Sequence, residues 1–155
     1  MKKYNTYTYD FIRADSDTNW SQGTKKSKVK TITCNIPILT KYEQYTDVDD
    51  PVRLKSKIIF PREFGYNVYV DTSGQYALPQ QAESIITDKS EEIFSYFNSK
   101  IIRFIMKECS WVPQSDFYLL RLIPKVEDKI WTDEELYNHF KLTHSEIDLI
   151  EKTTK

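Results

Sequence analysis

Residues 88–106 read DKSEEIFSYFNSKIIRFIM, and in this stretch the hydrophobic period of the chain becomes that of a helix. Apolar side chains recur at spacings of three and four residues, at Ile93, Phe94, Phe97, Ile101, Phe104 and Ile105. Such spacing produces one apolar stripe along a helix. Asp88 precedes Glu91 by three residues, which is close to a capping box. We therefore expect one helix of about 20 residues, beginning near Asp88 and ending before Pro113.

The chain before this helix shows the alternation of half-buried strands, in which every second side chain is apolar. This alternation predicts strands at residues 29–36, 54–60 and 66–70. Short strands around residues 75–78 and 83–87 would complete the sheet, and the polar residues 10–28 and 40–52 are predicted as loops. In residues 54–60 the alternation puts Lys55 and Lys57 on the face opposite to the apolar side chains. These segments predict a small, mostly antiparallel sheet.

The chain after the helix contains two further helix starts. Residues 132–135 (TDEE) and 143–146 (THSE) both match the S/T-x-x-E capping box. Residues 117–123 are apolar and fit either a helix or a strand. The expected fold is therefore α+β: a small, mostly antiparallel sheet packed by one long helix, with a C-terminal helical hairpin.

Length and charge suggest one domain with an uneven charge distribution. The 155 residues carry a net charge of −1, and a chain of this length usually forms one domain. We expect a single domain, residues 1–155, in three parts: a loop-rich basic part (1–53), the sheet with the long helix (54–125), and an acidic helical hairpin (126–155). Residues 1–60 carry a net charge of +4 and residues 126–155 a net charge of −4.

Composition excludes several classes of protein. Only three glycines occur, so neither the dinucleotide-binding fingerprint nor the nucleotide-triphosphate loop is present, and no cofactor is expected. The two cysteines form no CxxC pair, which favours a reducing, intracellular setting. No secretory signal or membrane-spanning run is evident. We expect a soluble cytoplasmic protein without a membrane partner.

Two stretches together resemble a known family. They are YFNSKIIRF at residues 96–104 and IWTDEELY at residues 130–137, the second continuing to LTHSEI at residues 142–147. They are similar to the C-terminal target-recognition region of restriction–modification N6-adenine DNA methyltransferases, including those fused to a nuclease. The resemblance covers residues 54–152. It implies a small sheet followed by a helix, and a domain that binds DNA and selects the site without carrying the methyl-transfer chemistry.

The catalytic motifs of that family are absent from this chain. The family's Asn/Asp-Pro-Pro-Tyr/Phe loop does not occur, since Asp50-Pro51 is the only Asp-Pro pair and no second proline follows it. Residues 1–53 match no family. We therefore expect a non-catalytic domain with no catalytic or metal-binding residues. Its expected partners are double-stranded DNA and a methyltransferase or restriction subunit.

Clustered cations are the candidate DNA-binding residues. Phosphate binding needs such clusters on one surface, and tyrosine or glutamine side chains nearby can stack on bases or contact their edges. The candidates are Lys25, Lys26, Lys28, Lys30, Arg53, Lys55, Lys57, Arg62, Tyr66, Gln80 and Gln81, with Tyr69 beside them. A solvated lysine-bearing face is the alternative interpretation. The terminal helices are not expected to read DNA, because their net negative charge repels phosphate.

Three other functions remain open. A protein-interaction or regulatory module could bind such an enzyme through the acidic end of the chain. Asp116, Glu127 and Lys129 loosely match an Mg²⁺-dependent nuclease pattern. The four potential zinc ligands lack the short spacing of zinc sites: Cys34, Cys109, His139 and His144. We expect Cys109 in the core and both histidines capping helices or facing solvent.

Overall fold

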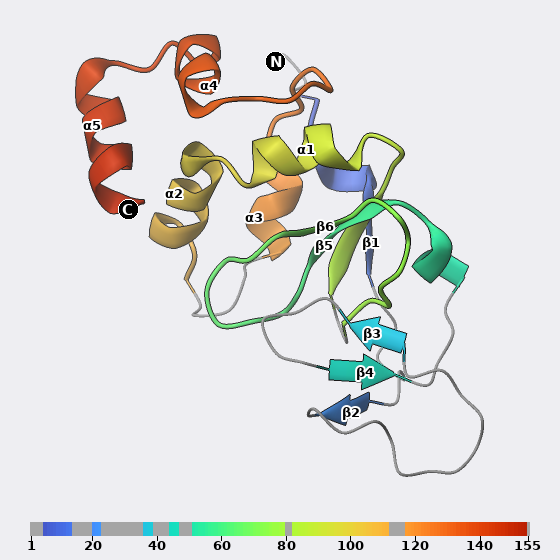
Figure 1. The fold of residues 1–155 in the computed structure, drawn as a ribbon. Coiled ribbons are helices and arrows are strands. Elements are labelled where there is room, and N and C mark those ends of the chain that lie inside the picture. The colour runs from blue at the N-terminus through green and yellow to red at the C-terminus, as the bar shows by residue number, and fades with distance from the viewer. Residues whose placement is uncertain are drawn as a thin grey trace, which may run out of the picture.

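The computed structural model describes residues 5–13, 20–22, 36–38, 44–46, 51–79, 82–111 and 117–154. Figure 1 shows the elements that these residues form. The strands are β1 (Phe11–Arg13), β2 (Trp20–Gln22), β3 (Ile36–Ile38), β4 (Gln44–Thr46), β5 (Lys57–Phe60), β6 (Tyr69–Asp71) and β7 (Glu83–Ile86). The helices are α1 (Ser90–Phe97), α2 (Lys100–Glu108), α3 (Phe117–Leu122), α4 (Asp133–His139) and α5 (His144–Thr153), with 3₁₀ turns η1 (Tyr7–Tyr9) and η2 (Pro51–Leu54).

The described strands form two antiparallel sheets. A four-stranded sheet has the order β1-β7-β5-β6, and a three-stranded sheet has the order β2-β4-β3. In the larger sheet, Ile58 of β5 lies opposite Ile85 of β7 and Val70 of β6. The predicted α+β fold with a small antiparallel sheet is confirmed.

β5 is buried on both faces, and the predicted exposed face of residues 54–60 is wrong. Ile58 and Phe60 belong to the main core, which also contains buried side chains of α1. Ile59 packs on the other side with Leu78 and Ala82. The strand begins only at Lys57, because residues 51–54 form η2. A strand that is buried on both faces shows no alternation of exposed and buried side chains, so a period of two cannot identify an exposed face.

The other strand predictions had mixed outcomes. Residues 83–87 were placed correctly, since β7 spans Glu83–Ile86. The strand predicted at residues 66–70 begins too early in the sequence. β6 spans Tyr69–Asp71 instead, because Asp71 pairs with Lys57 of β5. Residues 75–78 form no named strand. Residues 29–36 lie outside the described residues except Ile36, where β3 begins. The predicted loops contain described strands: β1 and β2 in residues 10–28, and β4 in residues 40–52.

The predicted long helix is two helices, and the break lies at Asn98–Ser99. Ser99 has extended backbone angles (φ −63°, ψ 157°), and its hydroxyl accepts from the Ile102 N–H at 3.5 Å. The Lys100 N–H donates to the Asp133 carboxylate at 2.8 Å. Ser99 therefore acts as an N-cap inside the expected helix. At the start of α1 the expected capping box is absent, because Lys89 is the N-cap and makes no side-chain cap bond.

Aromatic side chains join α1 to the larger sheet. Phe97 of α1 lies in edge contact with Phe60 of β5 and with Tyr7 of η1, each at 5.0 Å between ring centroids. Phe97 and Phe60 are fully buried. Edge-to-face pairs of this kind add to the free energy gained by burying the rings. The core of the fold thus lies between α1 and the sheet.

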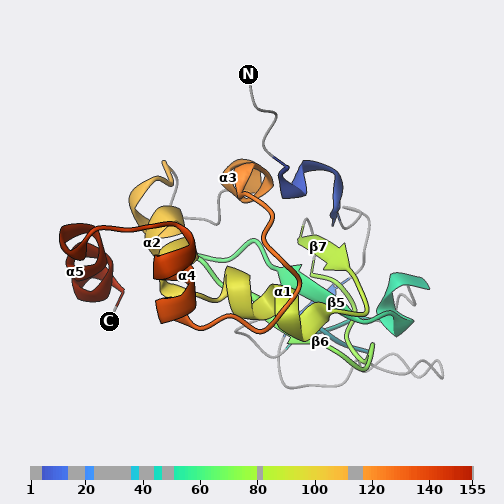
Figure 2. The ribbon, with the colours of Figure 1, turned by 90° about the horizontal axis from the view of Figure 1, so that it is seen from above.

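The C-terminal half is helical. Residues 117–123, which fitted either state, form the helix α3, and α3 packs on η1. α4 and α5 both begin with complete capping boxes at Thr132 and Thr143, as predicted. Both helices contact α2. Figures 1 and 2 show them beside α2, and Figure 1 shows the β2-β4-β3 sheet at the other end of the molecule.

Candidate functional site

The predicted cation cluster divides into exposed and buried members. Lys55 and Arg62 are exposed, and Arg53 is partly exposed. Lys57 is buried, and its ammonium donates to the carboxylate of Asp71 at 2.6 Å and to the carbonyl oxygens of Arg53 and Lys55. Lys57 was predicted as a DNA contact, and that prediction is wrong because its charge is neutralised in the interior.

Tyr66 was also predicted as a contact for DNA, but it is engaged inside the protein. Its hydroxyl donates to the Phe97 carbonyl oxygen at 2.8 Å, and its ring faces the guanidinium of Arg103 at 6.0 Å. Burial raises the pKa of the Tyr66 hydroxyl. Tyr69 donates to Glu63 at 3.4 Å, and burial together with the Glu63 charge raises the pKa of Tyr69 to about 12. The Tyr66 ring is therefore not placed to stack on a base.

The remaining candidates lie outside the described residues. These are Lys25, Lys26, Lys28, Lys30, Gln80 and Gln81. The four lysines fall in residues 23–35, between the end of β2 and the start of β3. β2 and β3, which precede and follow these lysines in the sequence, both pair with β4.

A groove lies between α1, β6 and the chain that leads into α4. It has a volume of about 620 Å³. Its apolar lining comes from Val70, Phe94, Ile130 and Trp131, and its polar lining includes Ser95 and Asp133. We refer to the surface formed by these six residues as the Trp131 groove. Ile130 is 57% exposed, whereas Phe94 and Trp131 are half-buried.

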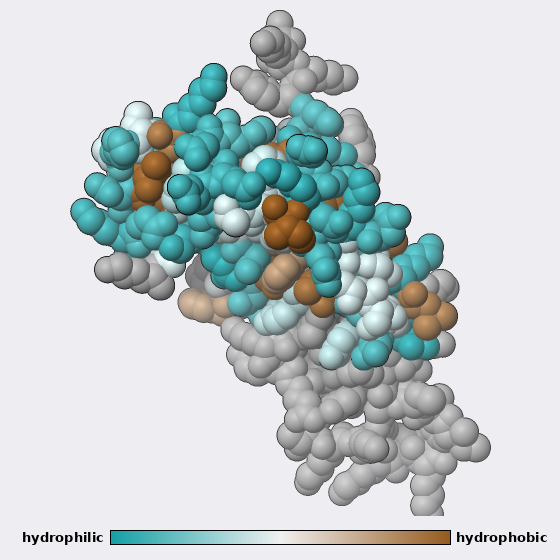
Figure 3. Space-filling model, turned by 45° about the horizontal axis from the view of Figure 1, so that its top comes forward, coloured by the Kyte–Doolittle hydropathy of each residue, from teal (hydrophilic) through white to brown (hydrophobic). Residues whose placement is uncertain are grey.

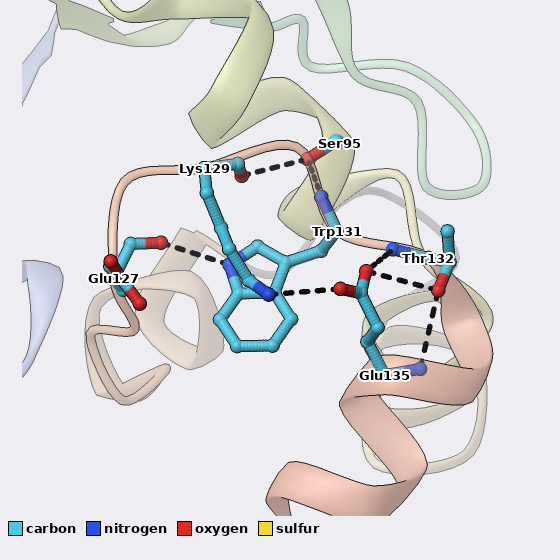
Figure 4. Close-up of polar contacts among 6 residues, drawn as sticks. All are labelled: Ser95, Glu127, Lys129, Trp131, Thr132 and Glu135. Atoms are coloured by element: carbon cyan, nitrogen blue, oxygen red, sulfur yellow. Dashed lines mark hydrogen bonds and ion pairs between the residues drawn. The ribbon is translucent and has the colours of Figure 1, made fainter.

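Hydrogen bonds hold Trp131 in place from two sides, as Figure 4 shows. The Ser95 hydroxyl accepts from the Trp131 backbone N–H at 2.9 Å and donates to the Glu92 carbonyl at 2.6 Å. The indole N–H donates to the Glu127 carbonyl at 2.9 Å. The Lys129 ammonium lies 4.1 Å from the centroid of the indole ring, within range of a cation–π interaction. The indole thus has a fixed position in the groove.

The start of α4 completes the arrangement in Figure 4. Glu135 accepts from the Thr132 backbone N–H at 2.9 Å and from the Lys129 ammonium at 2.9 Å, while Thr132 Oγ accepts from the Glu135 N–H. These bonds favour the carboxylate. The backbone N–H of Thr132 first, and then Lys129, lower the pKa of Glu135 to about 2.

A second set of polar contacts ties α5 to α2 and α4. Glu151 accepts from the Lys100 ammonium at 2.6 Å and from the Tyr137 hydroxyl at 2.7 Å. The hydrogen bond from Lys100 lowers the pKa of Glu151, and the same bond raises the pKa of Lys100. Burial, followed by the bond to Glu151, raises the pKa of Tyr137. Glu151 therefore links α5 to both α2 and α4.

The residues of the nuclease and zinc alternatives are only partly described. Lys129 is engaged with Glu135 and Trp131, and Asp116 and Cys34 lie outside the described residues. Cys109 is exposed at the C-cap of α2, so the prediction that it lies in the core is wrong: the buried stripe ends at Met106. His139 and His144 are exposed, as predicted. Within the described ranges, no group of three or more His, Cys, Asp or Glu side chains could hold a metal ion.

Comparison with known proteins gave no relative. The chain matches no protein family, no curated protein and no solved structure at a significant level. Among the residues that the structure describes, no helix combines the length and the apolar character needed to cross a membrane.

The Trp131 groove was not predicted as a site. Ile130 and Trp131 stood out only as part of the motif before a capping box, and Phe94 only as part of a helix stripe. A signal was present, because two large apolar residues, Ile130 and Trp131, stand directly between a charged run and a helix N-cap. The contribution of Ser95 depends on its contact with a residue 36 positions away, which the sequence does not reveal.

Proposed function

We propose that the chain binds double-stranded DNA without catalysing a reaction, as a target-recognition domain of a restriction–modification adenine methyltransferase system. Two features of the sequence support the proposal: the resemblance in residues 54–152 and the net charge of +4 in residues 1–60. The chain would act with a methyltransferase or restriction subunit, and a cytoplasmic location would follow from that role.

The observation that carries the proposal is the separation of charge along the sequence, together with the engagement of the acidic C-terminal helices by their own neighbours. The acidic helices α4 and α5 pack on α2, and the sheet that flanks the lysine-bearing residues 23–35 lies at the other end (Figure 1). Among the described ion pairs, Glu135 pairs with Lys129 and Glu151 with Lys100. These carboxylates are thus engaged near α2 and α4. Clustered lysines attract the phosphate backbone.

The burial of Lys57 changes which residues carry the proposal. Lys55 and Arg62 remain exposed beside the larger sheet. The main phosphate contacts are then assigned to Lys25, Lys26, Lys28 and Lys30. Lys57 holds the turn around Asp71 instead of contacting DNA.

Binding to a fluorescently labelled DNA duplex, measured by anisotropy at several salt concentrations, tests the proposal. With about four phosphate contacts, affinity should fall roughly 10²-fold between about 50 and 200 mM salt. A variant with Lys25, Lys26, Lys28 and Lys30 all changed to Glu should lose most of this binding. Lys152→Glu is the matched control, because Lys152 is exposed on α5 and should leave affinity within about twofold. Salt-insensitive binding, or full affinity in the quadruple variant, would refute the proposal.

A protein-interaction module is the second candidate function. The presence of the Trp131 groove favours it, since that surface combines exposed apolar side chains with carboxylates. Neither property suits contact with phosphate. The two functions use different residues and can coexist.

A further inference from the structure

The Trp131 groove exposes apolar surface that the proposed DNA contacts do not use. Ile130 is 57% exposed at its edge, and the side chains of Val70, Phe94 and Trp131 line it. Figure 3 shows hydrophobic side chains on this face surrounded by hydrophilic ones. Exposed apolar side chains that gather within a polar rim can serve as a binding site for another protein.

The rim of the groove is strongly acidic. Glu91 and Asp133 line the groove, and the stretches that contain them, residues 88–95 and 127–135, hold eight carboxylates and two lysines, a net charge of −6. Both lysines are already paired within the rim: Lys89 with Asp128 at 3.5 Å, and Lys129 with Glu135 at 2.9 Å. Glu91 and Glu134 are exposed. The rim therefore attracts cations and repels polyanions.

Hydrogen bonds within the chain also fix residues that line the groove. Ser95 fixes the backbone of Trp131, the Glu127 carbonyl fixes its indole N–H, and the capping box fixes Thr132. A site that is already ordered loses less conformational entropy when it binds. About 620 Å³ is room for one or two large side chains of a partner.

We propose that the Trp131 groove binds a segment of a partner protein in which a large apolar side chain is flanked by lysine or arginine. The apolar side chain enters beside Ile130 and Trp131. The flanking cations lie against Glu91 and the other rim carboxylates. Charge complementarity selects this occupant over an acidic segment, over DNA and over the identical acidic face of a second copy.

Synthetic peptides test the proposal with the full chain. The probes are labelled peptides in which Leu, Phe or Trp is flanked on both sides by Lys and Arg. Their twins carry either Glu in place of the cations or Ala in place of the apolar residue. Anisotropy should detect binding of the basic apolar peptides, and either replacement should weaken it about tenfold.

Paired variants locate the binding site. Ile130→Ser and Glu91→Lys should each weaken peptide binding by about five- to tenfold. Leu149→Ser and Glu108→Lys are the matched controls, since both side chains are exposed elsewhere, and they should leave affinity within about twofold. Far-ultraviolet circular dichroism checks that all four variants are folded.

Several outcomes would overturn the proposal. These are failure of every basic apolar peptide to bind, equal binding of the acidic twins, and equal affinity in Ile130→Ser. Sedimentation that shows self-association lost in Ile130→Ser would assign the groove to a second copy instead. The result is separate from the DNA proposal, because Ile130→Ser should leave salt-dependent DNA binding unchanged, and the quadruple lysine variant should leave peptide binding unchanged.

Discussion

The ammonium of Lys57 lies 2.6 Å from the carboxylate of Asp71, and both side chains are buried between β5 and the turn after β6. Each charge has further partners. Lys57 donates to two carbonyl oxygens, and Asp71 accepts from the backbone N–H groups of Gln75 and Tyr76 at 3.0 Å each. A buried ion pair of this kind needs such additional bonds to offset desolvation. It fixes the turn at residues 71–76 against η2.

Lys57→Ala should lower the free energy of unfolding by about 3–5 kcal/mol, because the Asp71 carboxylate would be buried without its cation. Lys55→Ala is the control, since Lys55 is exposed two residues away and its replacement should change stability by less than about 0.5 kcal/mol. Urea unfolding followed by circular dichroism measures both. Equal stability of the two variants would show that the pair does not stabilise the fold.

Gly74→Ala should destabilise the same turn. Gly74 has φ +67°, and a Cβ there would lie 2.5 Å from the backbone carbon of Leu54. Gly65 has φ +82° with nothing within 4 Å of a Cβ, so Gly65→Ala reports the cost of the backbone conformation alone. That cost is about 1–2 kcal/mol. Gly74→Ala should therefore have a lower melting temperature than Gly65→Ala in thermal unfolding. The reverse order would contradict the close approach of η2 to Gly74.

Ser95→Ala should loosen the Trp131 groove. The change removes the acceptor of the Trp131 backbone N–H, and a lost hydrogen bond at a partly buried site costs about 1 kcal/mol. Chemical denaturation measures this loss. Ser73→Ala, at an exposed position of the turn after β6, is the control with an expected change below about 0.5 kcal/mol. The peptide affinity of Ser95→Ala should fall as well, and unchanged values of both quantities would mean that Ser95 does not position the groove.

Acid should weaken the start of α4 through Glu135. The pKa of this carboxyl is lowered from 4.5 to about 2 in the folded chain, by the backbone N–H of Thr132 and then by Lys129. A lowered folded-state pKa means that the stabilisation is complete above pH 4.5 and is lost as the pH falls toward 2. An NMR titration of the Glu135 carboxyl should give a midpoint near 2.

Glu135→Gln should retain the helix start, because an amide oxygen can also accept from Thr132, but should abolish this part of the acid dependence of stability. Glu134→Gln, on the same turn, is the control and should keep it. A Glu135 midpoint near 4.5, or the same acid dependence in Glu135→Gln as in the parent protein, would contradict the conclusion that these bonds lower the pKa of Glu135.

Local patterns of sequence were sufficient for the C-terminal helices. The capping boxes at Thr132 and Thr143 each involve residues within three positions of one another, so their hydrogen bonds do not depend on tertiary contacts. The helical stripe before Met106 was likewise readable, because its periodicity is a property of neighbouring residues.

The candidate sites were harder to predict. The sequence drew attention to cations, yet whether a lysine on a strand faces solvent depends on what covers the strand. Lys55 is exposed and Lys57 is buried, although they lie two residues apart in the expected alternation. The Trp131 groove combines β6, α1 and the chain before α4, and no local pattern brings Val70 and Ile130 together.

The amino-acid order alone therefore determined the α+β class, the helix caps and the uneven charge, because each depends on composition or on contacts within a few residues. Tertiary packing decided the break at Ser99, where Asp133 accepts from Lys100 across 33 positions. Tertiary packing also decided that Lys57 is buried in an ion pair with Asp71, and it brought together the residues of the Trp131 groove. Contacts between distant residues form only when the whole chain is folded, and the free energy of burial then overrides the local pattern.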